Sequence, residues 1–117
     1  MRYMLLIYGD EDGWTPTTEE EGAAEMAKWV SYGEQIGAEG ILRGGDALQP
    51  TTAATTVRVR DGETQVTDGP FAETREQLGG YYLLECDTLD QAIEAARRVP
   101  SVGSGSVEVR PLMELDA

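Results

Sequence analysis

Two short runs of this sequence are apolar without interruption: residues 3–8 and residues 81–86, the latter broken only by Glu85. In a strand, successive side chains point to opposite faces, so a continuous apolar run needs both faces to be buried. Strands of this kind belong at the centre of a sheet. We therefore predict one sheet whose two central strands come from opposite ends of the chain.

Two segments have the spacing typical of helices, residues 18–37 and residues 88–98. Each begins with a capping box, Thr17–Glu20 or Thr18–Glu21 in the first segment and Thr88–Gln91 in the second. Apolar stripes then predict the buried face of each helix: Met26, Trp29, Val30 and Ile36 in the first, and Leu89, Ala92, Ile93 and Ala96 in the second.

Residues 55–60 alternate strictly between polar and apolar, and residues 64–67 do so more weakly. Asp61-Gly62 between them is a strong hairpin signal. With further strands at 41–48 and 107–112, the order is β-α-β-hairpin-β-α-β. This order predicts an α+β, ferredoxin-like split βαβ fold with an inserted β-hairpin, in a single domain spanning residues 1–117.

Two helices cover only one face of such a sheet, yet the central strands are apolar on both. A second copy of the chain is the simplest cover for the other face. We therefore predict a homodimer packed sheet to sheet, which would form a dimeric α+β barrel.

Charge and composition exclude several functions. Twenty-two acids against nine bases give a formal net charge of −13, which would repel nucleic acid and anionic membranes. The chain contains no histidine, so it lacks a histidine base and the usual transition-metal ligands, and we predict no metal or other cofactor. Cys86 is its single cysteine and lies in an apolar run, which indicates a reduced, buried thiol. The first apolar run is too short for a signal sequence or membrane span, so we predict a cytoplasmic protein.

The most unusual segment is Asp68 to Gly80, in which a Gly-Pro step stiffens an acidic loop. When carboxylates converge, the pKa of one of them is raised, which would let a protein without histidine hold an acid or base near neutrality. Asp68 and Glu73 are therefore the candidate catalytic residues. The alternative is that Asp68 begins a turn, Phe71 fills the core, and Glu73 and Glu76 are solvated.

Four further residues are candidates for binding a ligand. Arg110 shares a strand face with Glu108 and is either an anion-binding fork or a surface ion-pair residue. Asp46 follows two glycines and is either a pocket acid or a strand-bulge residue. Phe71 and Tyr82 would supply the apolar wall of the pocket. Tyr81 and Tyr82 point to opposite faces, so one belongs to the core and the other is free to face a pocket.

Several segments resemble the DGPF branch of the YCII-related family: residues 2–7, 45–50, 57–58, 67–74, 76–82 and 107–111. The resemblance covers nearly the whole chain. It implies a dimeric α+β barrel of ferredoxin-like subunits, and an association of DGPF members with extracytoplasmic-function sigma factors. It also implies, for short YCII members, an acid/base pair of a helix histidine and an aspartate before a proline. This chain has no histidine and has Val99 before Pro100, so that pair does not carry over.

Two functions follow as hypotheses. In the first, the protein binds or transforms a small molecule in a pocket of the dimer, with carboxylates as acid and base. In the alternative, it is a non-catalytic regulatory or accessory protein whose acidic segment, residues 10–21, meets a basic surface on an extracytoplasmic-function sigma factor. A third possibility is a structural module whose acids serve only solubility.

Overall fold

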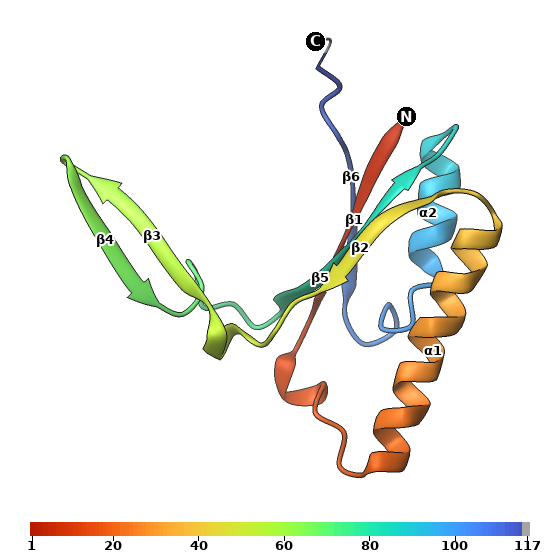
Figure 1. Cartoon of the computed structure of the whole chain (residues 1–117), viewed down its shortest axis with the longest axis horizontal. Helices are drawn as coiled ribbons and strands as arrows, with labels where there is room; N and C mark the ends of the chain where they lie inside the picture. Colours follow the sequence, from red (N-terminus) through yellow and green to blue (C-terminus); the bar gives the residue numbers. More distant parts are fainter. Residues whose placement is uncertain (116–117) are drawn as a thin grey trace.

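The computed structural model describes residues 1–115 and shows a four-stranded antiparallel sheet, two helices on one of its faces, and a separate two-stranded hairpin (Figure 1). The elements in chain order are β1 (Arg2–Gly9), the 3-10 helix η1 (Glu11–Gly13), α1 (Glu19–Ala38), β2 (Leu42–Ala47), the 3-10 helix η2 (Thr51–Ala53), β3 (Thr55–Arg60), β4 (Glu63–Asp68), β5 (Gln77–Glu85), α2 (Leu89–Arg97) and β6 (Ser106–Pro111).

The sheet has the strand order β2-β5-β1-β6, so the two apolar runs form its central strands, as predicted. The order and the two helices are those of a ferredoxin-like α+β fold. On the helix side, Leu5 lies opposite Tyr82 on one neighbouring strand and Val109 on the other. This side holds the core, which includes Leu5, Leu84 and the thiol of Cys86, buried as predicted.

Both helix starts are where the capping signals predict them. The Thr18 hydroxyl accepts a hydrogen bond from the backbone N–H of Glu21, and the Thr88 hydroxyl accepts one from Gln91. Among the described residues, no helix is both long and apolar enough to cross a bilayer.

The predicted buried stripe of α1 is partly wrong. Ile36 is buried and Trp29 packs against the core, but Met26 and Val30 are 64% and 52% exposed. The N-terminal half of α1, which includes Met26, extends past the sheet and has nothing to pack on (Figure 1). Val30 lies off the buried face of the helix, which is formed by Trp29, Tyr32 and Ile36. Likewise, α2 packs through small residues, Ala92, Ala95 and Ala96, which leaves Leu89 and Ile93 about half exposed.

The inserted hairpin forms as predicted, and it points away from the rest of the molecule (Figure 1). Asp61 and Gly62 at its tip both have positive φ, 53° and 78°, as a type I′ turn requires. We call residues 55–68 the arm. Val57 and Val66 lie directly opposite each other, and Val59 shares their face; all three are 58–66% exposed.

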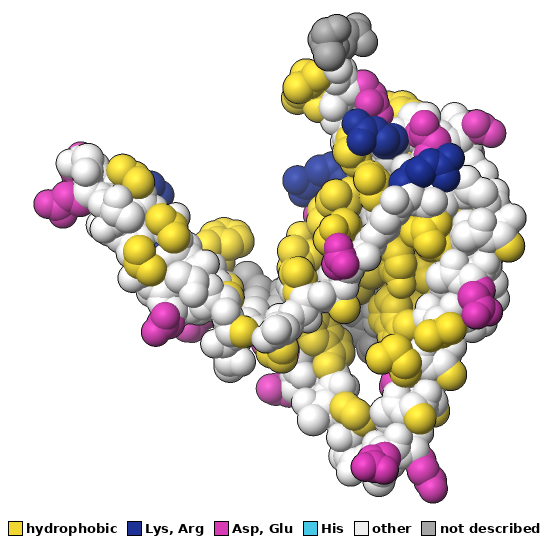
Figure 2. Space-filling view, viewed as in Figure 1, with side chains coloured by type: hydrophobic (Ala, Val, Ile, Leu, Met, Phe, Trp, Pro, Cys, Tyr) yellow, Lys and Arg dark blue, Asp and Glu magenta, His cyan; other side chains and the backbone are white. Residues whose placement is uncertain are grey.

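The side of the sheet away from the helices is called here the open face. Alternation and register place an apolar strip on it, formed by Met4, Leu6 and Tyr8 of β1 and by Tyr81 and Leu83 of β5. These side chains are only half-buried. Hydrophobic atoms are visible both on the arm and on the sheet surface turned toward it (Figure 2).

Candidate functional site

One edge of the open face carries a pair formed by Asp46 and Tyr81. Asp46 on β2 lies opposite Tyr81 on β5, and the Tyr81 hydroxyl donates a hydrogen bond of 2.8 Å to the Asp46 carboxylate. This hydrogen bond, together with the negative charge of Asp46, raises the pKa of Tyr81, because both favour the neutral phenol. The pair therefore presents a proton donor already bound to a carboxylate.

The other edge carries Arg110 and Glu108 on β6. Register places Arg110 opposite Met4 and Glu108 opposite Leu6, so both lie on the open face, while Val109 faces the helices. Arg110 and Glu108 therefore share one strand face, as the alternation of the sequence predicted. The guanidinium pairs with the Glu108 carboxylate, and the Arg110 side chain is 66% exposed, so its outer N–H groups remain available to an anion.

Asp68, Phe71 and Glu73 lie at the end of the arm and in the loop that follows it. Asp68 is the last residue of β4 and lies opposite Thr55; Asp68 and Glu73 are both exposed. Phe71 is 78% exposed, so it does not fill the core as one interpretation of the sequence proposed. In a single copy these three side chains face solvent.

The backbone of this segment is fixed to the arm. The Thr56 hydroxyl donates to the carbonyl of Gly69 at 2.7 Å, and the Arg58 guanidinium donates to the carbonyl of Phe71 at 2.9 Å. Gly69 has φ +106°, which side-chain-bearing residues rarely adopt. The Gly-Pro step therefore gives Phe71 a defined place relative to the arm.

Tyr82 lies on the helix side of the sheet. Its ring packs edge-on against Tyr32 with centroids 5.3 Å apart, and burial raises the pKa of its phenol. Tyr81, which we did not select from the sequence, is the phenol that faces the open side. An uninterrupted apolar run gives no signal that distinguishes the two.

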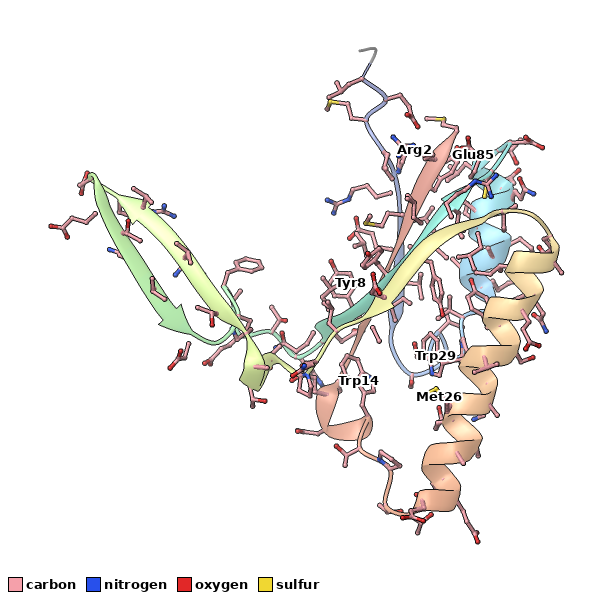
Figure 3. All side chains as sticks on the ribbon, viewed as in Figure 1. Arg2, Tyr8, Trp14, Met26, Trp29 and Glu85 are labelled. Carbon is pink, nitrogen blue, oxygen red and sulfur yellow. The ribbon has the colours of Figure 1, made fainter. Side chains whose placement is uncertain are left out.

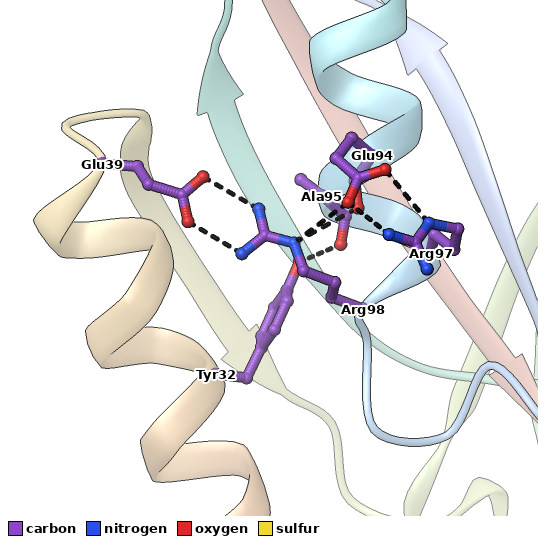
Figure 4. A network of polar contacts seen from close by, with 6 residues as sticks. All are labelled: Tyr32, Glu39, Glu94, Ala95, Arg97 and Arg98. Atoms are coloured by element: carbon purple, nitrogen blue, oxygen red, sulfur yellow. Dashed lines mark hydrogen bonds and ion pairs between the residues drawn. The ribbon is translucent and has the colours of Figure 1, made fainter.

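The helices meet in a polar network that is already complete within the chain (Figure 4). The Tyr32 hydroxyl donates to the carbonyl of Ala95 at 2.7 Å. The Arg98 guanidinium donates to both carboxylate oxygens of Glu39, at 2.7 and 2.8 Å, and this holds the pKa of Glu39 below its usual range. The nearby Arg97 pairs with Glu94. Arg98 therefore joins the ends of the two helices, whereas the Arg97 pair lies within α2.

Two surface hollows are lined by residues other than the predicted site residues. The first, of about 470 Å³, lies between α1 and the segment after α2, and its lining includes Lys28, Ser31 and Arg98. The second, of about 270 Å³, is formed by η1 and the loop before β5, with a lining that includes Asp10, Glu11 and Arg75. Neither of these two hollows therefore belongs to the predicted site.

The 3-10 helix η1 fixes the base of the arm. The Glu11 carboxylate accepts hydrogen bonds from the backbone N–H and the hydroxyl of Thr51, at 2.8 and 2.7 Å. The ring of Trp14 lies against Gly9 and Gly79 at the end of the sheet from which the arm departs (Figure 3). Sequence reasoning gave no role to Trp14 and considered Glu11 only as part of the acidic segment 10–21.

One copy of the chain therefore places the predicted site residues in three locations. Asp46 and Arg110 share the open face but lie on its two edge strands, three strand spacings or about 14 Å apart. Asp68, Phe71 and Glu73 lie at the arm. Tyr82 lies on the helix side.

Comparison with known proteins gives two matches. The profile of the YCII-related domain matches residues 1–116. A protein of Rhizobium meliloti (strain 1021), described as uncharacterized, is 43% identical to this chain over 114 residues, which cover 96% of this chain and 92% of the relative.

Proposed function

The chain belongs to the YCII-related domain family, and from that premise we propose that it is a homodimer of the DGPF branch that binds or transforms a small molecule. The chemistry would be proton transfer by carboxylates, without a metal or other cofactor. The pocket would lie over the open face, between two copies.

The open face carries this proposal, because it combines an apolar strip with a polar pair at each edge. Met4 and Leu6 run along its centre, the Asp46–Tyr81 pair lies at one edge, and Arg110 lies at the other. Pockets for small ligands typically have such an apolar lining with a few placed polar groups. A partly apolar molecule with an anionic group fits this pattern.

All of the predicted site residues except Tyr82 have a role in this proposal. Asp68 and Glu73 are the proton carriers, and Phe71 supplies apolar surface beside them. Arg110 anchors the anionic group through the guanidinium N–H groups that do not pair with Glu108. Asp46 orients the Tyr81 phenol, which takes the ligand-facing place first assigned to Tyr82.

The test is native mass spectrometry of freshly purified protein beside its denatured mass. We expect a dimer that carries a reproducible extra mass, lost on denaturation. Asp68→Asn should abolish retention or turnover of that molecule. Glu63→Gln is the matched control, because it removes the same charge from the far end of β4. A dimer without any added mass, or equal retention by the two variants, would contradict the proposal.

A second candidate is a regulatory partner of an extracytoplasmic-function sigma factor. Residues 10–39 contain nine acids and one base, and all six acids of the 10–21 segment except Glu11 are exposed. Such a surface is complementary to a basic protein. Binding to a purified sigma factor of this class should weaken steeply as salt is added, and an affinity that does not change with salt would count against this function.

A further inference from the structure

We propose that the arm of each copy reaches past the sheets and packs its valine face on the N-terminal half of α1 in the second copy. The open faces remain free to pack sheet to sheet. This inference rests on the homodimer proposed above, and it goes beyond that dimer by naming a second contact outside the sheets. It also makes the candidate site depend on the partner, because the arm leads directly into Asp68 and the loop that carries Glu73.

The arm has the properties of a hairpin that packs against something outside its own fold. A lone two-stranded hairpin is at best marginally stable in water. Val57, Val59 and Val66 form one continuous face, and within residues 1–115 nothing covers them. The opposite face is polar and includes Arg60, which lies opposite Glu63. This alternation is typical of a hairpin with one buried and one solvated side.

The arm extends toward the side of the sheet on which a sheet-to-sheet partner lies. Figure 1 shows both helices on one side of the sheet and the arm on the other. Facing sheets lie about 10 Å apart, whereas the six-residue strands of the arm span about 20 Å. The arm is therefore long enough to pass the end of the partner's sheet and to reach the helices behind it.

The N-terminal half of α1 lies at the same end of the sheet as the base of the arm. Since β1 and β2 are both antiparallel to β5, they run parallel to each other and finish at the same end of the sheet. The segment leading to α1 follows the end of β1, and the arm follows the end of β2. A two-fold axis that brings these ends of the two sheets together places each arm beside the partner's α1, on both copies at once.

This half of α1 offers the exposed apolar surface that such a contact requires. It extends past its own sheet, and Met26 and Val30, one helical turn apart, are both more than half exposed. Its charge also suits the arm. The helix contains five acids and one base, whereas β3 carries Arg58 and Arg60 beside its valines and has no acid.

The total surface indicates that the sheets are not the whole contact. The chain exposes 8293 Å², whereas a compact folded monomer of 12.7 kDa exposes about 6200 Å². A face of four strands, each about 25 Å long and about 4.8 Å from the next, measures about 500 Å² in outline. Sheet packing alone therefore leaves part of the excess of about 2000 Å² uncovered. Counted on both copies, this excess lies in the range of obligate dimers.

The first test compares matched substitutions by sedimentation equilibrium. Val66→Asp places a charge on the valine face of β4, and Gln65→Asp places the same charge on its polar face. Met26→Asp changes the proposed seat on α1, and Ile93→Asp is the control on α2. All four positions are exposed in one copy, so none of the changes disturbs the core. We expect Val66→Asp and Met26→Asp to raise the dimer Kd at least tenfold, because two contacts change in each dimer, and the two controls to change it less than threefold.

The outcomes separate this inference from the homodimer itself. If wild type is dimeric and Val66→Asp dimerises as well as Gln65→Asp, the arm does not hold the partner, while the dimer stands. If Met26→Asp dimerises as well as Ile93→Asp, the arm is not seated on α1, and the inference is overturned in the same way. If wild type is monomeric throughout the accessible concentration range, the inference and the homodimer fail together.

A second measurement does not depend on the stability of a variant dimer. Photoreactive benzoylphenylalanine replaces Val66 in unlabelled protein, which is unfolded, mixed with isotope-labelled protein that lacks it, and refolded. After irradiation, we expect cross-links to labelled peptides from residues 19–34. Cross-links to labelled peptides from residues 2–8 or 81–85 would place the arm on the open face and overturn the inference. Cross-links confined to the unlabelled chain, or to other segments of the labelled chain, would also overturn it.

Discussion

The packing of Trp14 against two glycines makes Gly79 a sensitive test of how the base of the arm is held. A Cβ at Gly79 would lie 2.5 Å from the Trp14 ring, closer than any real contact, and one at Gly9 would lie 2.8 Å from it. Gly79→Ala therefore forces the indole away from the sheet. The matched control is Gly44→Ala, on β2 of the same sheet, where an added Cβ has open space.

The magnitude follows from the burial of the ring. Trp14 is 39% exposed, so it buries about 150 Å² of its surface, worth at most about 4 kcal/mol. The ring is displaced rather than removed, and replacing glycine restricts the unfolded chain by about 0.5–1 kcal/mol. We expect Gly79→Ala to lower the free energy of unfolding by about 1–3 kcal/mol. Gly44→Ala should leave it unchanged or raise it slightly.

Urea unfolding followed by tryptophan fluorescence measures both effects in a Trp29→Phe background, in which Trp14 is the one remaining tryptophan. A loss of about 2 kcal/mol moves the urea midpoint by about 1 M. The native emission of Gly79→Ala should shift to longer wavelength as the indole becomes solvated. Equal midpoints and unchanged emission in the two glycine variants would refute the assignment of Trp14 as an anchor.

Three further predictions follow. Burial raises the pKa of Tyr32 and of Tyr82 in the folded protein. Their contribution to the free energy of unfolding is therefore intact below pH about 10 and falls above it, where the phenols of the unfolded chain ionise. Tyr32→Phe should make this loss of stability at alkaline pH smaller in unfolding experiments. Asp46→Asn should lower the pKa of Tyr81 toward its usual range. A ¹³C-tyrosine NMR titration that is the same in wild type and variant would contradict the interaction between the Asp46 carboxylate and the Tyr81 phenol. Since each copy carries a charge of −13, added salt should tighten the dimer in sedimentation experiments, and a dissociation constant that rises with salt would indicate attraction between opposite charges instead.

The fold could be predicted from the sequence because the starts of its helices and the position of its hairpin turn are set by nearby residues. The caps at Thr18 and Thr88 begin the helices, and Asp61-Gly62 permits the positive φ angles of the turn. The two apolar runs required central places in the sheet, and they have them. Each of these signals acts within a few residues, so tertiary structure did not override it.

The exposure of a side chain and the face of the sheet on which it lies were harder to predict, because both depend on distant parts of the chain. The spacing of Met26 matches a buried stripe, but whether a sheet lies beneath that turn depends on where the strands end. In the run containing Tyr81 and Tyr82 both faces are apolar, so alternation does not show which phenol faces the helices. Nothing local to the arm indicates that it leaves the sheet rather than joining it.

The division of the candidate site between arm and sheet permits a test by complementation. If the pocket is shared between copies, Asp68→Asn damages it from the arm and Arg110→Gln damages it from the sheet. Neither homodimer should retain the co-purifying molecule. A mixed dimer, however, pairs the intact arm of one copy with the intact sheet of the other, so one of its two sites is complete.

Random mixing makes half of the dimers mixed, so about one quarter of the sites should recover. The two variants are unfolded, mixed and refolded together, and native mass spectrometry then counts the sites that retain the molecule. If each site were built within one copy, every site in the mixture would carry one damaged residue, and retention would stay at the level of the parents. Recovery of a quarter therefore requires that arm and sheet act across the dimer, a result that composition, fold and family membership alone do not dictate.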